Sequence, residues 1–537
     1  MHEVYSYHTF MLPFTWNRSK LQDFSSIFNQ ENGVWVESRS DQQIKQARVE
    51  DCLHYNECRF FHLSARRAVY GDQNNDTVHN YHVKRELMEG AGYVITARKQ
   101  EIYMQIQDIC LKVYNTGVAI FVMDCINTGY DRAGAHCQNS VSIVKMINEY
   151  GRRIAIPYFT PEVSRMKCAD QLRIELDHGK LVLHEDFEKF VEEFHEKEQT
   201  EIVITYITDI IKKLLQFFTD QVVFSSRRSD EEDKLQIVPA IDSKMYVSCM
   251  IRDPIFYAQL LKEWNQEDSA FHEQELEKSV YELIYADLEE ECSCLNPAER
   301  RKQIRESLYL TNFPAQNRIN EPQGGQPDRT KTVPDQNTGE LTAITAHTYL
   351  CMTAGNQQFT LDNHNTVLKQ LILLVLAQRA SIIAFQNVMS KISCGLEIHQ
   401  QIMNNRKVSE LMNLQERFVV FQNQLILFEV TPQREGSAIY RCLQKRLYIE
   451  EENRKLRERL SGLAEMANIN QGYLFNKGGL ILAVFALIGA TFGSIGDLTL
   501  VPDGFVGLNG QAFALLLIEC ILCVVAAFII LKRIFRK

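Results

Sequence analysis

Two apolar runs near the end of the chain, GGLILAVFALIGATFGSIG at 478–496 and AFALLLIECILCVVAAFII at 512–530, decide the fold class. The first run ends before Asp497, and Glu519 is the only charged residue in the second. A helix needs about 20 apolar residues to cross the ~30 Å hydrocarbon core of a bilayer. The runs therefore predict two transmembrane helices, at about 478–497 and 512–531. Two buried core helices are the alternative, but the runs are adjacent, terminal and nearly charge-free, which favours a membrane hairpin.

Basic residues lie outside this hairpin and not within its connection. The segment that joins the two runs, DLTLVPDGFVGLNGQ at 497–511, has two Asp and no Lys or Arg. The outer flanks are basic, with Arg454, Lys455, Arg457, Arg459 and Lys477 before the hairpin and Lys532, Arg533, Arg536 and Lys537 after it. Because such residues stay on the cytoplasmic side of a membrane, both termini are expected in the cytoplasm. We therefore predict a multi-pass protein of the cell (inner) membrane.

One face of the first predicted span is small or polar enough to line a pore. It is formed by Asn476, Ala483, Leu487, Ala490, Ser494 and Asp497. A single hairpin cannot enclose a channel, so such a pore requires several copies of the chain. In the second span, Glu519 lies roughly 10 Å inside the membrane by helical rise. Ionisable residues there usually face protein or water, so Glu519 makes either a structural polar contact or part of a conduction path.

Residues 361–475 are expected to form long stalk helices that lead into the membrane. The first of three helical stretches, at 361–392, has no Gly or Pro and is far longer than a usual globular helix. The other two lie at 408–430 and 437–468. The last of them has apolar residues with a 4-3-4 spacing, at Leu456, Leu460, Leu463 and Ala467. This narrow stripe suits a stalk that packs against neighbouring subunits.

Residues 251–360 are expected to form a helical segment that contains a linker. The pattern is helical from Asp253 to Leu310. The stretch at 314–340 is polar and has four prolines, which indicates a linker or a mobile loop.

Residues 1–250 contain short apolar segments that are rich in β-branched and aromatic residues and are bounded by turns. We expect strands at 59–70, 92–97, 103–114, 117–125, 153–159, 234–240 and 245–251. The segment NSVSIVKMINEYG at 139–151 predicts a helix closed by Gly151. A strand, a helix and a strand in succession indicate a sheet with helices packed on it. The first 250 residues are therefore interpreted as an α/β or α+β cytoplasmic sensor head.

Composition and motifs argue against several function classes. The net charge of −10 disfavours a nucleic-acid-binding body, because phosphate contacts require clustered Lys and Arg. The 14 cysteines are scattered without a paired pattern, so free thiols in a reducing cytoplasm are expected. The sequence has no P-loop, no dinucleotide-binding glycine motif, no HExxH and no GxSxG. We therefore predict neither enzyme activity nor a cofactor.

Two groups of polar residues suggest metal or nucleophile chemistry, but neither has clear partners. His79 and His82 in HNYH offer two metal ligands that nothing completes, so no metal site is predicted. Asp131, His136 and Cys137 share one loop, where a Cys–His nucleophile is conceivable. A polar surface loop is the better interpretation of that segment.

Arg152 and Arg153 form the most suggestive polar feature of the head. They lie where the predicted helix ends and the next strand begins, beside Tyr150 and Tyr158. Arginine forks suit phosphate or carboxylate, and an aromatic face can stack a base, so we predict a ligand site at Arg152, Arg153 and Tyr150. The alternative is that the two arginines are solvated and interact with nearby acidic residues. Asp220 is a candidate acidic partner for an amine or a sugar hydroxyl of the same ligand.

This plan resembles the CorA-type membrane proteins. In that family an α/β cytoplasmic head precedes a long stalk helix, which continues into the first of two C-terminal membrane helices. Both termini are inside, and subunits form a pentamer around a pore lined by the first span. The resemblance concerns the layout and is closest at 437–537. Magnesium transporters of the family carry Gly-Met-Asn at the outer end of the first span, whereas this chain has only Gly507-Leu508-Asn509 nearby.

The large head, the arginine pair and the missing Gly-Met-Asn make the chain most similar to the CRISPR-associated CorA effectors of type III systems. That resemblance implies a head that senses a nucleotide messenger, an S-adenosylmethionine–AMP conjugate. It also implies a homo-oligomeric ion channel that perturbs the lipid bilayer in antiviral defence. A plain divalent-cation (magnesium) transporter is the alternative function, with metal as the regulator at acidic sites of the head. A membrane-tethered enzyme is disfavoured by the absence of catalytic motifs.

Overall fold

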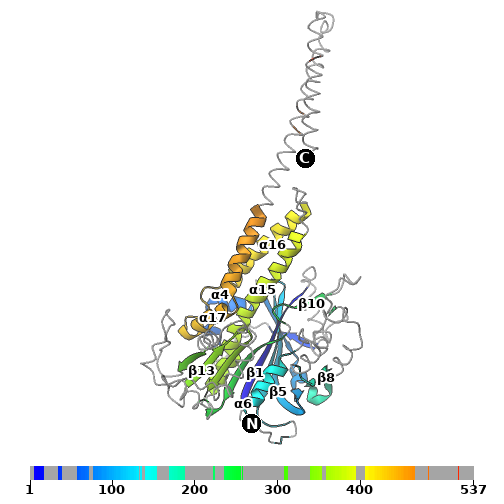
Figure 1. Cartoon of the computed structure of the whole chain (residues 1–537), viewed down its shortest axis with the longest axis vertical. Coiled ribbons are helices and arrows are strands. Elements are labelled where there is room, and N and C mark those ends of the chain that lie inside the picture. Colours follow the sequence, from blue (N-terminus) through cyan, green and yellow to red (C-terminus); the bar gives the residue numbers. More distant parts are fainter. Residues whose placement is uncertain are drawn as a thin grey trace, which may run out of the picture. The chain divides into compact units, whose positions relative to one another are not determined.

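The computed structural model describes residues 5–16, 34–38, 57–71, 77–131, 134–135, 140–153, 168–187, 222–223, 235–242, 244–254, 257, 308–312, 339–353, 358–394, 405–465, 482, 486 and 518. The chain divides into two compact units. The first comprises Met1–Asn387 and Arg417–Leu456, and the second comprises Val388–Glu416 and Arg457–Lys537. A large mixed sheet with helices packed on it forms the first unit (Figure 1).

The sheet has 14 strands among the described residues. Its main path runs β12–β13–β14–β11–β1–β6–β5–β4–β7–β8. Off this path, β10 pairs with β1 and β9, and β3 joins β2 to β5. Neighbours are antiparallel except for β11 with β14 and β9 with β10. The strands are β1 (Ser6–Trp16), β2 (Trp35–Glu37), β3 (Val78–Val83), β4 (Gly92–Ala97), β5 (Gln100–Tyr114), β6 (Val118–Asn127), β7 (Gln171–Leu176), β8 (Leu181–Asp186), β9 (Val222–Val223), β10 (Leu235–Pro239), β11 (Tyr246–Arg252), β12 (Leu308–Asn312), β13 (Gly339–Ile344) and β14 (Thr348–Thr353). Two short helical segments accompany them, α5 (Arg85–Met88) and η2 (Asp177–Gly179).

Most of the strands expected in the first 250 residues are present. The segments expected at 92–97, 103–114, 117–125, 234–240 and 245–251 correspond to β4, β5, β6, β10 and β11. The helix expected at 139–151 is α6 (Val141–Gly151), which Ser140 caps by accepting a hydrogen bond from the Ile143 backbone N–H. The strand expected at 153–159 lies outside the described residues after Arg153.

Two secondary-structure expectations are wrong. The segment at 59–70 is not a strand, because α4 occupies Leu63–Tyr70 and buries Ala65, Ala68 and Val69 at helical spacing. The segment at 251–360 is not only helix and linker, because it contributes β12, β13 and β14 to the sheet. The sheet-containing unit therefore continues well beyond residue 250.

Helix α6 covers the apolar face of the sheet. It contacts β4 and β11 and buries Val144 and Ile147 in the main apolar cluster. Phe10 from β1 and Phe121 from β6 belong to the same cluster and are fully buried. Removal of this apolar surface from water stabilises the fold by roughly 25 cal/mol per Å².

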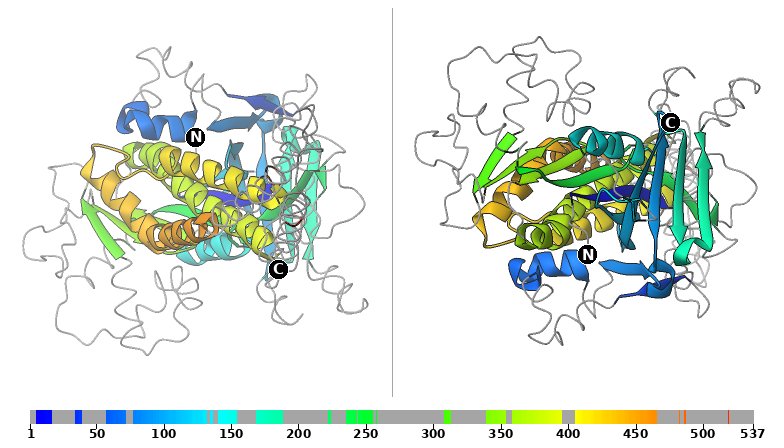
Figure 2. Two further views of the ribbon diagram at one scale, coloured as in Figure 1. Left: turned by 90° about the horizontal axis from the view of Figure 1, so that it is seen from above. Right: turned by 90° about the horizontal axis from the view of Figure 1, so that it is seen from below.

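A continuous helix lies on the opposite face of the sheet (Figure 2). It consists of α14 (Gln358–Asn363), one π-helical turn η3 (His364–Leu368) and α15 (Lys369–Cys394). The helix expected at 361–392 is therefore present. Its side chains from Leu371 to Ala377 are at most 1% exposed, so this part of α15 is a core helix and not a free stalk.

Among the described residues, one helical run is long and apolar enough to cross a membrane. It extends from Thr360 to Ser393, and 67% of its most apolar window is buried inside the protein. A core helix of a soluble body has the same properties, so this run is weak evidence for a membrane span.

The remaining helices only partly follow the expected boundaries. α16 (Asn405–Gln424) ends earlier than the expected 408–430. The expected helix at 437–468 is interrupted, because α17 (Arg434–Arg446) ends at a turn in which Tyr448 has a φ of 54°, and a new helix occupies 449–465. Leu456 and Leu460, expected to face neighbouring subunits, are at most 2% exposed within the single chain. These two positions therefore offer little free surface to another subunit.

The two predicted membrane spans lie outside the described residues except at three positions. Leu482 and Ala486 in the first span and Ile518 in the second are helical and exposed. Leu482 is 71% exposed and Ile518 is 53% exposed. At these positions, apolar side chains have little protein cover in the single chain.

Candidate functional site

A row of polar side chains lies on the sheet face that α15 covers. In the strand register, Asp124 of β6 stands opposite both Thr9 of β1 and Asp108 of β5. Directly opposed residues of antiparallel strands project to the same face of a sheet. The shared face therefore carries Thr9, His82, Asp108, Cys110, Lys112 and Asp124, which we call the polar row.

A β-bulge in β5 places Asp108 in the polar row. The register shifts between Ile106, which pairs with Cys125, and Asp108, which pairs with Asp124. Ile106 lies in the apolar cluster under α6. Strict alternation along the strand would put the Asp108 side chain on that same apolar face. The extra residue at Gln107 turns Asp108 to the α15 side, because a shift of one residue reverses every later side chain.

Lys369 binds the centre of the polar row from α15. Its Nζ lies 2.7 Å from Asp124 Oδ2, while the Thr9 hydroxyl donates to Asp124 Oδ1 at 2.7 Å. Burial alone would lower the pKa of Lys369, but the negative charges of Asp124 and Asp108 outweigh it and raise the pKa above its ordinary value. Asp124 is 2% exposed, and both of its carboxylate oxygens have a partner within the protein.

Lys112 extends the row toward α4. Its Nζ donates hydrogen bonds to the Val69 carbonyl oxygen at 2.9 Å and to Gln370 Oε1 at 2.7 Å. Burial of the ammonium group lowers the pKa of Lys112 to about 8. This lysine links β5 to α4 and to the start of α15.

His364 joins the π-helical turn to the other side of the row. Its Nε2 lies 3.1 Å from the Ser248 hydroxyl, and its ring contacts Tyr7 and Tyr349 at centroid distances of 5.7 and 5.9 Å. Burial lowers the pKa of His364 to about 3, so the ring is neutral at physiological pH. A π-helical turn often occurs at a functional position.

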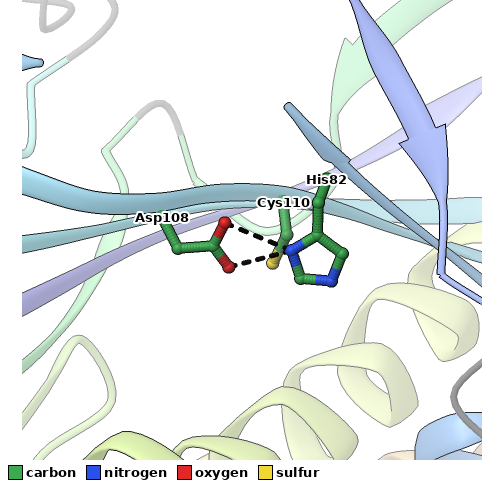
Figure 3. A group of neighbouring side chains, drawn as sticks. All are labelled: His82, Asp108 and Cys110. Carbon is green, nitrogen blue, oxygen red and sulfur yellow. Dashed lines mark hydrogen bonds and ion pairs between the residues drawn. The ribbon is translucent and has the colours of Figure 1, made fainter. Parts of the chain in front are cut away.

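His82, Asp108 and Cys110 form the open end of the polar row (Figure 3). His82 Nδ1 lies 2.9 Å from Asp108 Oδ2 and 3.2 Å from Oδ1. The side chains of His82 and Asp108 are 41% and 33% exposed, whereas Cys110 is buried. One donor atom from each residue lies within 4.8 Å of the other two, so the three residues could hold a metal ion.

The same geometry does not suit a nucleophilic cysteine. A Cys–His–Asp relay uses both nitrogens of the ring, one for the thiol and one for the carboxylate. In Figure 3, His82 Nδ1 faces both the carboxylate and the sulfur, and Nε2 points away from them. Burial also raises the pKa of the Cys110 thiol well above its ordinary value, which disfavours the reactive thiolate.

The structure places Arg152 in a structural role that the sequence did not indicate. Its Nε donates to the Met245 carbonyl oxygen at 2.9 Å, Nη1 donates to Thr348 Oγ1 at 3.2 Å, and Nη2 donates to the His347 carbonyl oxygen. Arg152 is 4% exposed. The alternative of a solvated arginine is therefore wrong for Arg152, because its fork joins the end of α6 to β11 and β14.

Arg153 and Tyr150 are also buried. Arg153 is 9% exposed and forms an isolated β-bridge with Lys244, and Tyr150 is 2% exposed with the Arg98 guanidinium 5.7 Å from its ring centroid. The solvated alternative is thus wrong for Arg153 as well, and the Tyr150 ring is not open for stacking a base. The role of these residues in binding a ligand stays a prediction.

The other predicted site residues are separated or lie outside the described residues. His79 lies on the opposite face of β3 from His82, and its Nδ1 pairs with Glu37 Oε1 at 2.9 Å. Asp131 Oδ1 accepts a hydrogen bond from the Ala135 backbone N–H at 2.7 Å. Residues outside the description are His136, Cys137, Tyr158, Asp220, Asn476, Ala483, Leu487, Ala490, Ser494, Asp497 and Glu519.

The comparisons with known proteins give no relative. No protein-family model, no curated protein sequence and no solved structure matches this chain.

Proposed function

We propose that this protein is a membrane effector in which the sheet-containing unit senses a ligand and controls a C-terminal pair of membrane helices. One observation carries the proposal: two nearly charge-free runs of about 20 residues stand together at 478–497 and 512–531. The exposure of Leu482 and Ile518 is consistent with helices whose apolar surface is covered by lipid. The core helix α15 does not compete for this role, because its apolar side chains are already buried by protein.

The ligand in this proposal is a nucleotide messenger, an S-adenosylmethionine–AMP conjugate. The basis is the resemblance to CRISPR-associated CorA effectors, which also suggests a homo-oligomer, a pentamer in that family. Since one hairpin cannot enclose a pore, control of permeability requires several chains around an axis. Binding of the messenger shifts the equilibrium only if the open state binds it more tightly than the closed state.

Vesicle leakage tests this function. The purified full chain is reconstituted into liposomes that contain a self-quenched dye, and the messenger is added outside. Rapid, dose-dependent release is expected with the conjugate, and no release with S-adenosylmethionine or AMP alone. A chain that lacks residues 476–537 is the control and should give no leakage. If magnesium enters the vesicles without any messenger and the dye is not released, the result would instead support the divalent-cation transporter.

A further inference from the structure

We propose that His82, Asp108 and Cys110 bind a zinc ion at the open end of the polar row. Two neighbouring strands supply the three ligand types that zinc accepts in proteins: an imidazole nitrogen, a carboxylate oxygen and a thiolate sulfur. This inference does not depend on the proposed membrane function, because it rests on β3 and β5 alone.

The geometry needs only a small adjustment to accept the ion. One donor atom of each residue lies within 4.8 Å of the other two. Tetrahedral zinc with ligands at 2.0–2.3 Å holds its donor atoms roughly 3.3–3.8 Å apart. Figure 3 shows His82 Nδ1 facing the Asp108 carboxylate with the Cys110 sulfur beside it, so the three donor atoms already lie close together.

Binding requires a defined movement of protons. His82 Nδ1 must present its lone pair, so the single proton of the neutral ring resides on Nε2. Cys110 binds as the thiolate, and its proton is released to solvent. With Asp108 ionised, the two negative ligands balance the charge of zinc, and the site is neutral. The nearby ammonium group of Lys369 does not oppose the bound ion, because the carboxylate of Asp124 pairs with this ammonium group at 2.7 Å.

The choice of zinc follows from the ligands. A thiolate disfavours Mg²⁺, Ca²⁺ and Mn²⁺, which prefer oxygen, whereas a mixed sulfur, nitrogen and oxygen set suits zinc. Three protein ligands leave a fourth position for water, and the partial exposure of His82 and Asp108 provides a path for the ion from solvent. The expected effect is to fasten β3, which also carries β2, onto β5.

Metal analysis of the full chain in detergent tests this site. After treatment with a chelator and a reductant, the protein is titrated with zinc, and bound metal is counted after desalting. We expect one zinc per chain that depends on these three residues and a rise in melting temperature on binding. Cobalt in place of zinc should give the near-ultraviolet thiolate-to-cobalt absorption band, and this band should disappear in Cys110→Ser.

Matched variants decide the outcome. His82→Asn should bind zinc at least about 100-fold more weakly. Loss of a residue that only hydrogen-bonds to a metal ligand already lowers metal affinity about 10–100-fold, and loss of a direct ligand should lower it more. His79→Asn is the control, because His79 lies on the same strand and the opposite face, and it should bind like the wild type. If Cys110→Ser does not fold, the test uses His82→Asn and Asp108→Asn, because the side chains of His82 and Asp108 are partly exposed. No bound zinc in the wild type at micromolar concentrations, or unchanged zinc binding in a folded His82→Asn protein, would overturn the proposal.

Discussion

Lys369 Nζ lies 2.7 Å from Asp124 Oδ2, and this ion pair joins the start of α15 to the centre of the sheet. The strand register sets Asp124 between Thr9 and Asp108, so one lysine meets the middle of the polar row. A buried ion pair can be neutral for stability as a whole, but loss of one partner leaves an uncompensated charge. The pair therefore fixes where α15 sits on the sheet.

Substitution of this lysine should be strongly destabilising. Lys369→Met leaves Asp124 buried and partly unpaired, and we expect a loss of about 3–5 kcal/mol in the free energy of unfolding. The double variant Lys369→Met/Asp124→Asn should recover part of that loss, because neither member of the ion pair is left as an uncompensated charge. Thermal denaturation in detergent measures both. Glu101→Gln is the control, since it removes an exposed ion pair with Arg173 at 2.9 Å and should cost about 1 kcal/mol or less. Equal melting temperatures for Lys369→Met and Glu101→Gln would contradict this role.

Acid should destabilise the protein through two buried histidines. Burial lowers the pKa of His8 to about 4 and that of His364 to about 3, whereas both titrate near 6.5 when unfolded. Below pH 6.5 the unfolded state takes up protons that the folded state does not, so stability falls as pH decreases toward 4. Each histidine contributes a slope of about 1.4 kcal/mol per pH unit in that window.

Unfolding transitions measured between pH 7 and pH 4 check this slope. His364→Gln should flatten the decline, because the side chain no longer takes up a proton on unfolding. His184→Gln, at an exposed position of β8, is the control and should keep the wild-type slope. The same pH dependence in His364→Gln and in the wild type would exclude this source of acid sensitivity.

Substitution of Arg152 should lower the stability of the fold. Arg152→Lys keeps the charge but loses the fork that reaches Met245, His347 and Thr348, and we expect a loss of about 2–4 kcal/mol. Arg98→Ala removes an exposed cation that lies above the Tyr150 ring and should cost about 0.5–1 kcal/mol. Melting temperatures of the two variants distinguish these effects. An Arg152→Lys protein as stable as the wild type would contradict this structural role of Arg152.

Local sequence pattern was sufficient for five of the 14 strands of the sheet. β-branched and aromatic runs identified β4, β5, β6, β10 and β11, because alternation and turn residues are local signals. The segment at 59–70 misled, since its aromatic ends resemble a strand while Ala65, Ala68 and Val69 repeat at helical spacing. The strands at 308–353 were missed because their places are set by pairing with the distant β11.

The polar row could not be assembled from the sequence. His82 meets Asp108 and Cys110 only through the pairing of β3 with β5, and the bulge at Gln107 reverses the face on which Asp108 lies. The available signal was the presence of charged residues within apolar strands, as at Lys112 and Asp124. The structural role of Arg152 could not be predicted either, because its carbonyl partners come from segments about 90 and 200 residues away.

Membrane topology is the most direct test of the central claim. Short epitope tags are inserted within 502–509 and, separately, after Lys537, and intact cells are probed with an impermeant reagent before and after permeabilisation. We expect the tag within 502–509 to be labelled in intact cells, and the tag after Lys537 only after permeabilisation, because basic flanks stay in the cytoplasm. If the tag within 502–509 becomes accessible only after permeabilisation in a stably folded protein, the two-span hairpin and the effector function built on it are contradicted.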